Sequence, residues 1–293
     1  MKKITSHILA LLLFSGLAAG QTQPPSTDIY LVELSEQNGS VKVGRPVNIT
    51  DREGYDNQPS FMRDGRSILF TSIREEGQSD IYRYNIADGS TVRVIQTAES
   101  EYSPTVTPDG KFFSVIRVEK DSTQRLWKFP VGGGEPVLVL ERIKPVGYHL
   151  WIDERTLALF ILGNPNTLQI VEVGTEKSET AASSIGRSLH RRPRQDKINF
   201  VRKISEQEWM IEEMDIKTKK ISSLSKTLPA SEDFVWTATG TMLMAKGSKL
   251  YSRNPEKDKD WQEVADFSSS GVKSVTRLAV SPQGDRLAMV ASK

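Results

Sequence analysis

A short turn recurs along this chain at a nearly constant spacing, and no other feature of the sequence restricts the fold as strongly. Six times the turn joins one apolar run to the next, and successive turns are 45, 44, 42, 44 and 44 residues apart. A fixed period of about 40 to 50 residues is typical of repeat architectures. The six turns are Asp64-Gly65, Asp109-Gly110, Asp153-Glu154, Gln195-Asp196, Thr239-Gly240 and Gln283-Gly284.

Each repeat can be divided into four short strand signals. They are runs of β-branched or aromatic residues bounded by Gly, Pro, Asp and Asn. The chain begins with an outer pair of strands (28–50) and ends with an inner pair (278–292), so the two ends together complete a sixth sheet. The sequence therefore predicts an all-β fold, a six-bladed β-propeller of four-stranded antiparallel blades. In this fold the N- and C-terminal strands share one blade and close the ring, which leaves only short, protected edges.

Residues 1–20 have the pattern of a cleavable signal peptide. Lys2 and Lys3 precede an apolar run from Ile8 to Leu17, and small residues lead to a cleavage site after Gly20. The run is too short to span a bilayer, so no transmembrane anchor is expected. We expect a periplasmic or secreted protein with a linker at 21–27 and a propeller over 28–293.

The charge balance and the lack of cysteine restrict the function. The chain has 39 Lys and Arg against 37 Asp and Glu, and removal of Lys2 and Lys3 leaves 37 against 37. A neutral surface argues against nucleic-acid binding, which needs a basic stripe. Without cysteine there are no disulfides and no thiolate metal site. We expect a monomer that needs no cofactor.

Two repeats carry a turn that identifies a family. They are 57–66 and 102–111, and the segment Ser281-Pro282-Gln283-Gly284 repeats the turn near the C-terminus. Pro presets the first turn position, and Gly accepts a positive φ. With Asp80-Ile81-Tyr82 as the following strand, the pattern resembles the WD40-like (PD40) repeat of TolB-type propellers.

The resemblance implies an exported, usually periplasmic propeller that binds partner proteins at one mouth of the ring. The α/β domain that precedes the propeller in TolB is not expected here. Seven residues, 21–27, separate the expected cleavage site from the first strand. A complete TolB role in envelope translocation is therefore in doubt, although an envelope or extracellular protein partner is expected.

The sequence contains no recognisable catalytic motif. It lacks a Gly-x-Ser-x-Gly elbow, a His-Glu-x-x-His motif, a P-loop and an EF-hand loop. We therefore expect a non-catalytic scaffold.

The alternative is a metal-dependent propeller enzyme of the lactonase or sugar-dehydrogenase type, with oxygen ligands over the channel as calcium prefers. Its candidate ligands are Asp56, Asn57, Glu101 and Asp233. A third hypothesis is an accessory subunit of an envelope complex that binds through the sides of its blades.

Acidic, aromatic and histidine side chains gather just before or at the start of the innermost strands. In a propeller these segments converge on one end of the channel, where a rigid scaffold commonly carries a binding site. The alternative is that such loops are polar for solubility. His149 and His190 form either a shared ligand site or two partly exposed strand ends, and we favour the second. The candidate residues are Tyr55, Asp56, Glu101, Tyr102, Tyr148, His149, His190, Glu232 and Asp233.

Two further groups of residues have a structural and a functional interpretation. The basic cluster in the fourth repeat is either an anion-binding patch, because Arg pairs well with carboxylates, or a solvated loop. We favour the loop, and the cluster comprises Arg187, Arg191, Arg192, Arg194 and Lys197. The five tryptophans lie in expected strands, where they either fill the space between sheets or form a carbohydrate platform or quinone-cofactor cage, and we favour the packing role. They are Trp127, Trp151, Trp209, Trp236 and Trp261.

Overall fold

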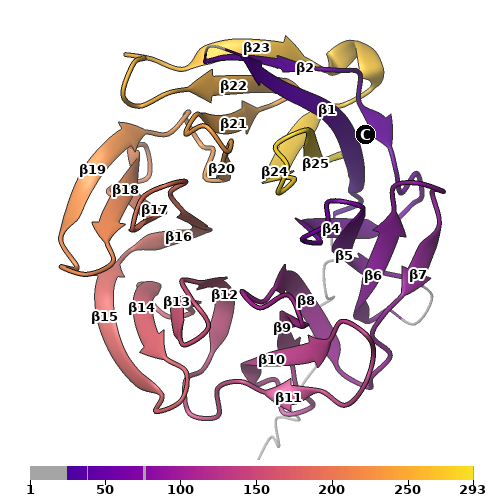
Figure 1. The fold of residues 1–293 in the computed structure, drawn as a ribbon, viewed down its shortest axis with the longest axis vertical. Coiled ribbons are helices and arrows are strands. Elements are labelled where there is room, and N and C mark those ends of the chain that lie inside the picture. Colours follow the sequence, from indigo (N-terminus) through magenta and orange to yellow (C-terminus); the bar gives the residue numbers. More distant parts are fainter. Residues whose placement is uncertain (1–24, 38, 75–76, 293) are drawn as a thin grey trace, which may run out of the picture.

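The chain forms a ring of six β-sheets around a central channel (Figure 1). The computed structural model describes residues 25–37, 39–74 and 77–292, and the expected signal peptide lies outside these residues. Within the described ranges the helical structure is a single 3-10 turn, Ser268–Ser270. The predicted all-β, six-bladed propeller is therefore confirmed.

Five blades are four-stranded antiparallel sheets whose strands follow one another in sequence. Blade 1 comprises β4 (Tyr55–Phe61), β5 (Ser67–Ile73), β6 (Ser79–Asn85) and β7 (Thr91–Arg93). Blade 2 comprises β8 (Ser100–Val106), β9 (Phe112–Val118), β10 (Gln124–Pro130) and β11 (Val137–Leu138). Blade 3 comprises β12 (Val146–Trp151), β13 (Thr156–Ile161), β14 (Thr167–Glu172) and β15 (Lys177–Ser183). Blade 4 comprises β16 (Ile185–Arg191), β17 (Lys197–Lys203), β18 (Trp209–Asp215) and β19 (Ile221–Lys226). Blade 5 comprises β20 (Phe234–Trp236), β21 (Met242–Lys246), β22 (Lys249–Arg253) and β23 (Gln262–Asp266).

Blade 6 joins the two ends of the described chain, as predicted. It combines β24 (Ser274–Val280) and β25 (Arg286–Ser292) with β1 (Asp28–Gln37), β2 (Ser40–Val43) and β3 (Val47–Asn48). β1 pairs antiparallel with β25 from Asp28↔Ala291 to Glu33↔Arg286. The outer edge of this blade is divided between β2 and β3, which pair with different parts of β1, so the sheet has five strands.

The recurring turns join the first two strands of each blade. Gly65 and Gly110 adopt φ of 65° and 71°, the left-handed region that favours glycine. A Cβ at Gly65 would lie 2.0 Å from the side-chain oxygen of Gln283 in blade 6, so the turns of neighbouring blades touch. The third and fourth turns lack glycine. At the third, the Asp153 carboxylate accepts a 2.8 Å hydrogen bond from the backbone N–H of Arg155.

The hydrophobic core lies between the blades. One cluster packs Ile198 and Phe200 of blade 4 against Ala158 and Leu168 of blade 3. The tryptophans belong to this interblade packing, as expected from the sequence: Trp151 and Trp236 are buried and the other three are partly buried against the clusters or at their edge.

Irregular pairing of the inner strands links blade 1 to blade 2. The registers of β4 and β8 shift at Gln58 and Ser103, which adopt φ of 56° and 54°. These are β-bulges, which re-aim side chains locally. The side-chain oxygen of Gln58 accepts hydrogen bonds of 2.8 Å from the Thr71 hydroxyl and 2.8 Å from the Ser103 backbone N–H. One side chain therefore connects two blades beside the channel.

All six inner strands run in the same direction along the channel, because each begins after the preceding blade and ends at a tight turn. We call the end where they begin the mouth, and the opposite end the turn face. The described chain also starts at the mouth, where Thr27 forms an isolated parallel bridge with Tyr55 and its hydroxyl donates to Asp56 O at 3.0 Å. Thr27, expected in the linker, is buried against the propeller.

A search of the described residues for a helix that could cross a membrane finds none.

Candidate functional site

The channel contains a cavity of about 360 Å³ lined by the inner strands of all six blades. Near the mouth the lining includes Tyr148, Arg187, Asp233 and Arg277. Two residues further along the same strands, towards the turn face, the lining is apolar. These residues are Leu150, Leu189, Val235 and Ala279. The cavity therefore has a polar level at the mouth and, beneath it, a level that is apolar on blades 3 to 6 and carries Ser60 and Thr105 on blades 1 and 2; we call this the apolar level.

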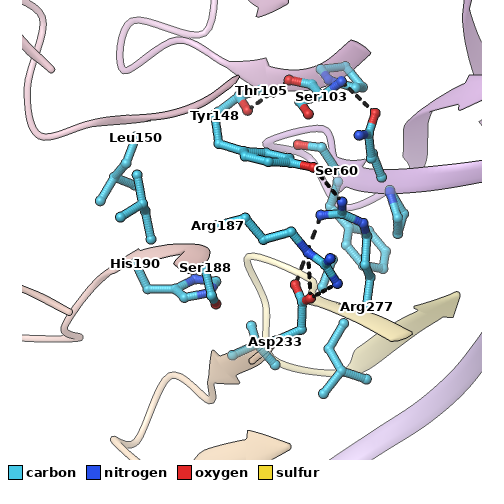
Figure 2. Close-up of a pocket in the computed structure, with 18 of the residues that line it drawn as sticks. Ser60, Ser103, Thr105, Tyr148, Leu150, Arg187, Ser188, His190, Asp233 and Arg277 are labelled. Carbon is cyan, nitrogen blue, oxygen red and sulfur yellow. Dashed lines mark hydrogen bonds and ion pairs between the residues drawn. The ribbon is translucent and has the colours of Figure 1, made fainter. Parts of the chain in front are cut away.

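A side chain crosses the channel at the polar level. Arg277 extends from β24 in blade 6 to Tyr148 on β12 in blade 3, the opposite blade of the ring (Figures 1 and 2). Its Nη2 donates a 2.8 Å hydrogen bond to the Tyr148 hydroxyl, and its guanidinium carbon lies 5.2 Å from the centroid of that ring. Burial is the largest single influence and lowers the pKa of Arg277, but Asp233, Tyr148 and Tyr55 together raise it by more, so the pKa lies above its ordinary value and the group stays charged.

A second arginine continues the network on the other side of Asp233 (Figure 2). The Nε of Arg187 donates to Asp233 Oδ2 at 2.9 Å, and its Nη2 bonds the same oxygen. Its Nη1 lies 3.1 Å from Glu232, and that carboxylate is paired at 2.7 Å with the ammonium of Lys203. Asp233 is thus the counter-ion of Arg187, whereas Arg277 Nη1 lies 4.0 Å away from it.

The described lining of the cavity carries an excess of positive charge. Two guanidiniums, Arg187 and Arg277, face one carboxylate, Asp233, so the sum is +1. The lining histidines add nothing, because burial lowers the pKa of His149 to about 3 and that of His190 to about 4. Since a small low-dielectric cavity focuses such a charge, the polar level favours an anionic group.

The two histidines line the same cavity but contact different neighbours, so the structure does not pair them with each other. The Nε2 of His149 lies 2.6 Å from Ser114 Oγ in blade 2, whereas the ring of His190 packs on Phe234 in blade 5 at a centroid distance of 4.8 Å. Ser114 Oγ donates to Thr105 O and accepts from Trp151 Nε1. His149 must therefore donate through Nε2 as a neutral ring.

Asp56 and Glu101 occupy equivalent places in β4 and β8 but do not line the cavity. Asp56 is fully buried and pairs with Arg52 at 3.0 Å. Glu101 is also fully buried, pairs with Arg117 at 3.1 Å and accepts a 2.6 Å hydrogen bond from the Thr97 hydroxyl. Burial raises the pKa of Glu101 to about 7, against the lowering effect of Thr97 and Arg117.

The remaining predicted residues lie around the polar level. Burial raises the pKa of Tyr55 to about 12, although the positive charge of Arg277 acts in the opposite direction. Tyr102 packs against the core between blades 2 and 3, and Glu232 lines a second cavity beside the channel. Of the nine predicted residues, the structure gathers Tyr148, His149, His190 and Asp233 around the channel cavity.

The proposed set of metal ligands is not assembled. Asp56, Glu101 and Asp233 each form an ion pair with a different arginine, and Asn57 Nδ2 donates to the Thr27 hydroxyl at 3.4 Å. In the part of the chain that the structure describes, no three His, Asp or Glu side chains are arranged to hold a metal ion.

Sequence reasoning missed Arg277 and assigned Arg187 to a solvated loop. A signal for Arg277 exists: when the repeats are aligned on the turns, Gln58, Ser103, Asp233 and Arg277 each lie seven residues before the turn glycine. The side chains of Gln58, Asp233 and Arg277 form polar contacts that join different blades across or around the channel.

The interpretation of the basic cluster as a solvated loop is wrong for Arg187, Arg192 and Lys197, whose side chains form ion pairs within the fold. Arg187 lines the channel, and the buried Arg192 bonds Glu213 and lies 2.9 Å from Glu256. Lys197 pairs with the same Glu213. The cause is that β16 still forms an inner strand, with a register shift between Ile185 and Leu189, so Arg187 reaches Asp233 of blade 5 and Arg192, just after β16, reaches Glu213 of β18.

Two more cavities adjoin the channel on the mouth face. One, of about 380 Å³, shares Arg187 and Arg277 with the channel, and the other, of about 490 Å³, shares Lys203 and Trp209 with the first. Beside them lie Leu162, 36% exposed, and Ile204, 54% exposed, in the loops after β13 and β17. The hollow of the channel therefore extends over the mouth face of blades 3 to 6.

Comparisons with known proteins agree with this architecture. Residues 15–138 match the family model described as the PD40 TolB beta propeller domain. A protein of Agrobacterium tumefaciens provisionally assigned as TolB superposes with a TM-score of 0.70 at 14% identity, covering 91% of this chain and 98% of its own. The resemblance of the repeats to TolB-type propellers is thereby confirmed. None of the curated proteins matches the sequence.

Propellers of other functions share the fold. A gluconolactonase from Xanthomonas campestris superposes with a TM-score of 0.63 at 8% identity, covering 93% of this chain and 99% of its own. A chain of a nidogen/laminin complex gives 0.59 at 10% identity, covering 91% and 98%. At these identities the likeness concerns the fold alone, because unrelated functions recur on one propeller scaffold.

Proposed function

We propose that this TolB-like propeller is an exported, non-catalytic binding protein that engages a protein partner at the mouth of its channel. The observation that supports this most is the convergence of Tyr148, Arg187, Asp233 and Arg277, from four different blades, on one end of a preformed cavity. Side chains held in this way by rigid strands are typical of binding sites.

The surface around the mouth has the composition that protein interfaces favour. A stable interface buries roughly 800 Å² on each partner and has an apolar, aromatic centre. Leu162, Ile204 and Trp209 provide apolar area beside the channel, and the ion-paired Arg187 and Lys203 lie between them and the cavity. A partner protein that covers this face could insert one segment into the mouth and contact the polar level of the channel.

The ionisable groups of the cavity favour binding over acid–base chemistry. Asp233 is held by Arg187, and the low pKa of His149 and of His190 keeps both rings neutral at neutral pH. A general base needs a free lone pair within reach of the substrate and a pKa near the working pH. The groups that line the cavity do not combine these properties.

Photo-crosslinking in the cells that produce the protein tests this proposal. A photoreactive amino acid is placed at Ile204 on the mouth face or, as a matched control, at Val92 on the outer edge of blade 1, which is 46% exposed. We expect a discrete crosslinked protein from position 204 and none from position 92. Crosslinking at position 92 alone would contradict the proposal and favour the hypothesis that partners bind the blade sides.

The alternative function, a metal-dependent propeller enzyme, makes a different prediction. We expect protein purified without chelator to contain far less than one divalent ion per chain, because each acidic candidate ligand is paired with an arginine. Elemental analysis measures the metal content, and a melting curve with and without EDTA measures its effect on stability. One bound ion per chain, with a melting temperature lowered by EDTA, would overturn the non-catalytic proposal.

A further inference from the structure

We propose that the channel binds a carboxylate carried on an apolar body, with the carboxylate on Arg277 and the apolar part directed towards the turn face. The inference rests on the proposed function, since it names the chemical class that the mouth would receive.

The first argument is the unused hydrogen-bonding capacity of Arg277. A guanidinium has five N–H donors, and Arg277 uses one of them on the neutral hydroxyl of Tyr148. The 4.0 Å separation from Asp233 is beyond hydrogen-bond distance. The side chain is only 15% exposed, and it lines the cavity. A buried cation with free donors therefore faces the cavity, and a carboxylate can accept two of its hydrogen bonds side by side.

A neighbouring hydroxyl could donate to the same ligand. Ser103 lines the cavity from blade 2, next to Tyr148 of blade 3 (Figure 2). Its hydroxyl oxygen is buried and has no hydrogen-bond partner among the described residues. A buried polar group without a partner costs free energy, and an acceptor from a ligand would satisfy it.

The net charge of the lining indicates a monoanion. One excess positive charge remains after Asp233 neutralises one arginine. A carboxylate matches this single charge, whereas a dianionic phosphate would bring a second negative charge into the cavity without a counter-ion.

The apolar level determines what the carboxylate is attached to. Leu150, Leu189 and Val235 each follow a polar-level residue by two positions. A strand rises about 3.3 Å per residue, so this level lies roughly 6 to 7 Å deeper in the channel. An alkyl chain or an apolar side chain reaches that depth from a bound carboxylate. The cavity, at about 360 Å³, lies in the size range of small-ligand sites.

Isothermal titration calorimetry with matched pairs of ligands tests the inference on the unmodified protein. Octanoate is compared with octanamide, and a short acetylated peptide ending in leucine is compared with its C-terminal amide. We expect one acid per chain to bind, and the neutral partner of the pair to bind at least tenfold more weakly. Preferential binding of octanoate over octanamide would identify a free amphipathic acid as the ligand. Preferential binding of the peptide acid over its amide would identify the C-terminus of a protein. Equal binding of acid and amide in both pairs, or no binding, would overturn the inference.

Variants assign the carboxylate to the channel. Arg277→Gln should weaken binding of the acid about tenfold or more and leave the weak binding of the amide unchanged. Asp233→Asn should strengthen acid binding several-fold, because it removes the competing negative charge. Arg142→Gln is the control, since Arg142 is a 71% exposed arginine outside the channel lining. Unchanged acid affinity in the folded Arg277 variant would contradict the inference, while crosslinking at Ile204 would still support the proposed function.

Discussion

At the scale of single residues, the protein uses ion-paired carboxylates in two ways. Asp233 lies in the channel between two arginines and beside an open cavity. Glu101 lies between strands of blade 2 with Arg117 and Thr97, away from that cavity. The first arrangement leaves a cation accessible to a ligand. The second ties neighbouring strands together but places an ionisable group in a fully buried position, which makes folding depend on pH.

Replacing Glu101 by glutamine should remove a pH dependence of stability. The folded pKa of about 7 lies above the ordinary value of 4.5, so its favourable contribution is complete below pH 4.5 and is lost as the pH rises through 7. One pKa unit corresponds to about 1.4 kcal/mol, so the loss is about 3 kcal/mol. We expect urea unfolding to show decreasing stability of the wild type from pH 5 to pH 8 and a flatter profile for Glu101→Gln.

The exposed Glu135→Gln variant is the control for this titration, because its carboxylate is solvated in the folded state. It should reproduce the wild-type profile. Parallel pH profiles for the wild type and Glu101→Gln would show that Glu101 stays ionised in the folded protein over this range.

The sequence could predict only some of the candidate residues that line the channel. The sequence pattern predicts that polar residues gather around the start of the inner strands, and of these Tyr148 and Asp233 line the cavity there. Orientation could not be predicted, because a bulge changes which side of the strand a residue faces. Asp56 and Glu101 therefore form interblade or intrablade ion pairs instead of facing the channel. Arg277 directly precedes the inner run 278–280, but it is neither acidic, aromatic nor histidine, so the pattern does not include it.

At the scale of the elements, the bulges of the inner strands connect neighbouring blades as well as shaping the channel. Gln58 bonds Thr71 within its own blade and the Ser103 backbone of the next blade. Such a contact complements the apolar packing between blades, which has no preferred register of its own. The bulge is the element that brings the Gln58 amide into position, since its backbone has a φ of 56°.

Gln58→Ala should therefore destabilise the fold by about 2 kcal/mol, because two partly buried hydrogen bonds are lost at roughly 1 kcal/mol each. The exposed Gln262→Ala variant should change the free energy of unfolding by less than about 0.5 kcal/mol. Urea denaturation followed by tryptophan fluorescence measures both. If the two variants are equally stable, the contact between blades does not contribute to stability.

The inner hairpins could be predicted from the sequence more accurately than the outer strands. Turn residues such as Gly65 and Gly110 have a specific backbone requirement, and this makes the period visible. The outer strands need only a few pairing residues, and β7, β11 and β3 contain three, two and two residues. Strands of two or three residues are too short to show a recognisable sequence pattern. The division of the outer edge of blade 6 between β2 and β3 could therefore not be predicted.

At the scale of the whole molecule, the ring depends on the pairing of β1 with β25. Ile29 and Val32 of β1 are buried in two different core clusters with residues of β25. The closure therefore completes the packing on both sides of blade 6. We expect the stability of the ring to depend on the contact between β1 and β25 more than on where the chain starts and stops. The two strands pair antiparallel, and the two described ends lie side by side.

A circular permutant tests this view of closure. Ser292 is joined to Asp28 through a short turn, and the chain is opened between Gly132 and Gly133, where a Cβ at either position would meet nothing within 4 Å. This permutant should preserve a single cooperative unfolding transition. A chain shortened to end at Val280 should lose that transition, because β1 then has no inner neighbour. Loss of cooperative unfolding in the permutant would mean that the original chain order is itself required.

The position of the described chain ends beside the mouth determines which face of the protein remains accessible when it is attached to a surface. Thr27 pairs with Tyr55 at the start of β4, and Ala291 pairs with Asp28, so both described ends lie on the face that carries the channel opening. A tether attached directly at either of these described ends therefore turns that face towards a support and leaves the six tight turns facing the solution. A sensor surface prepared in this way would obstruct the site, whereas a tether on the exposed Gly132–Gly134 loop would leave the opening accessible.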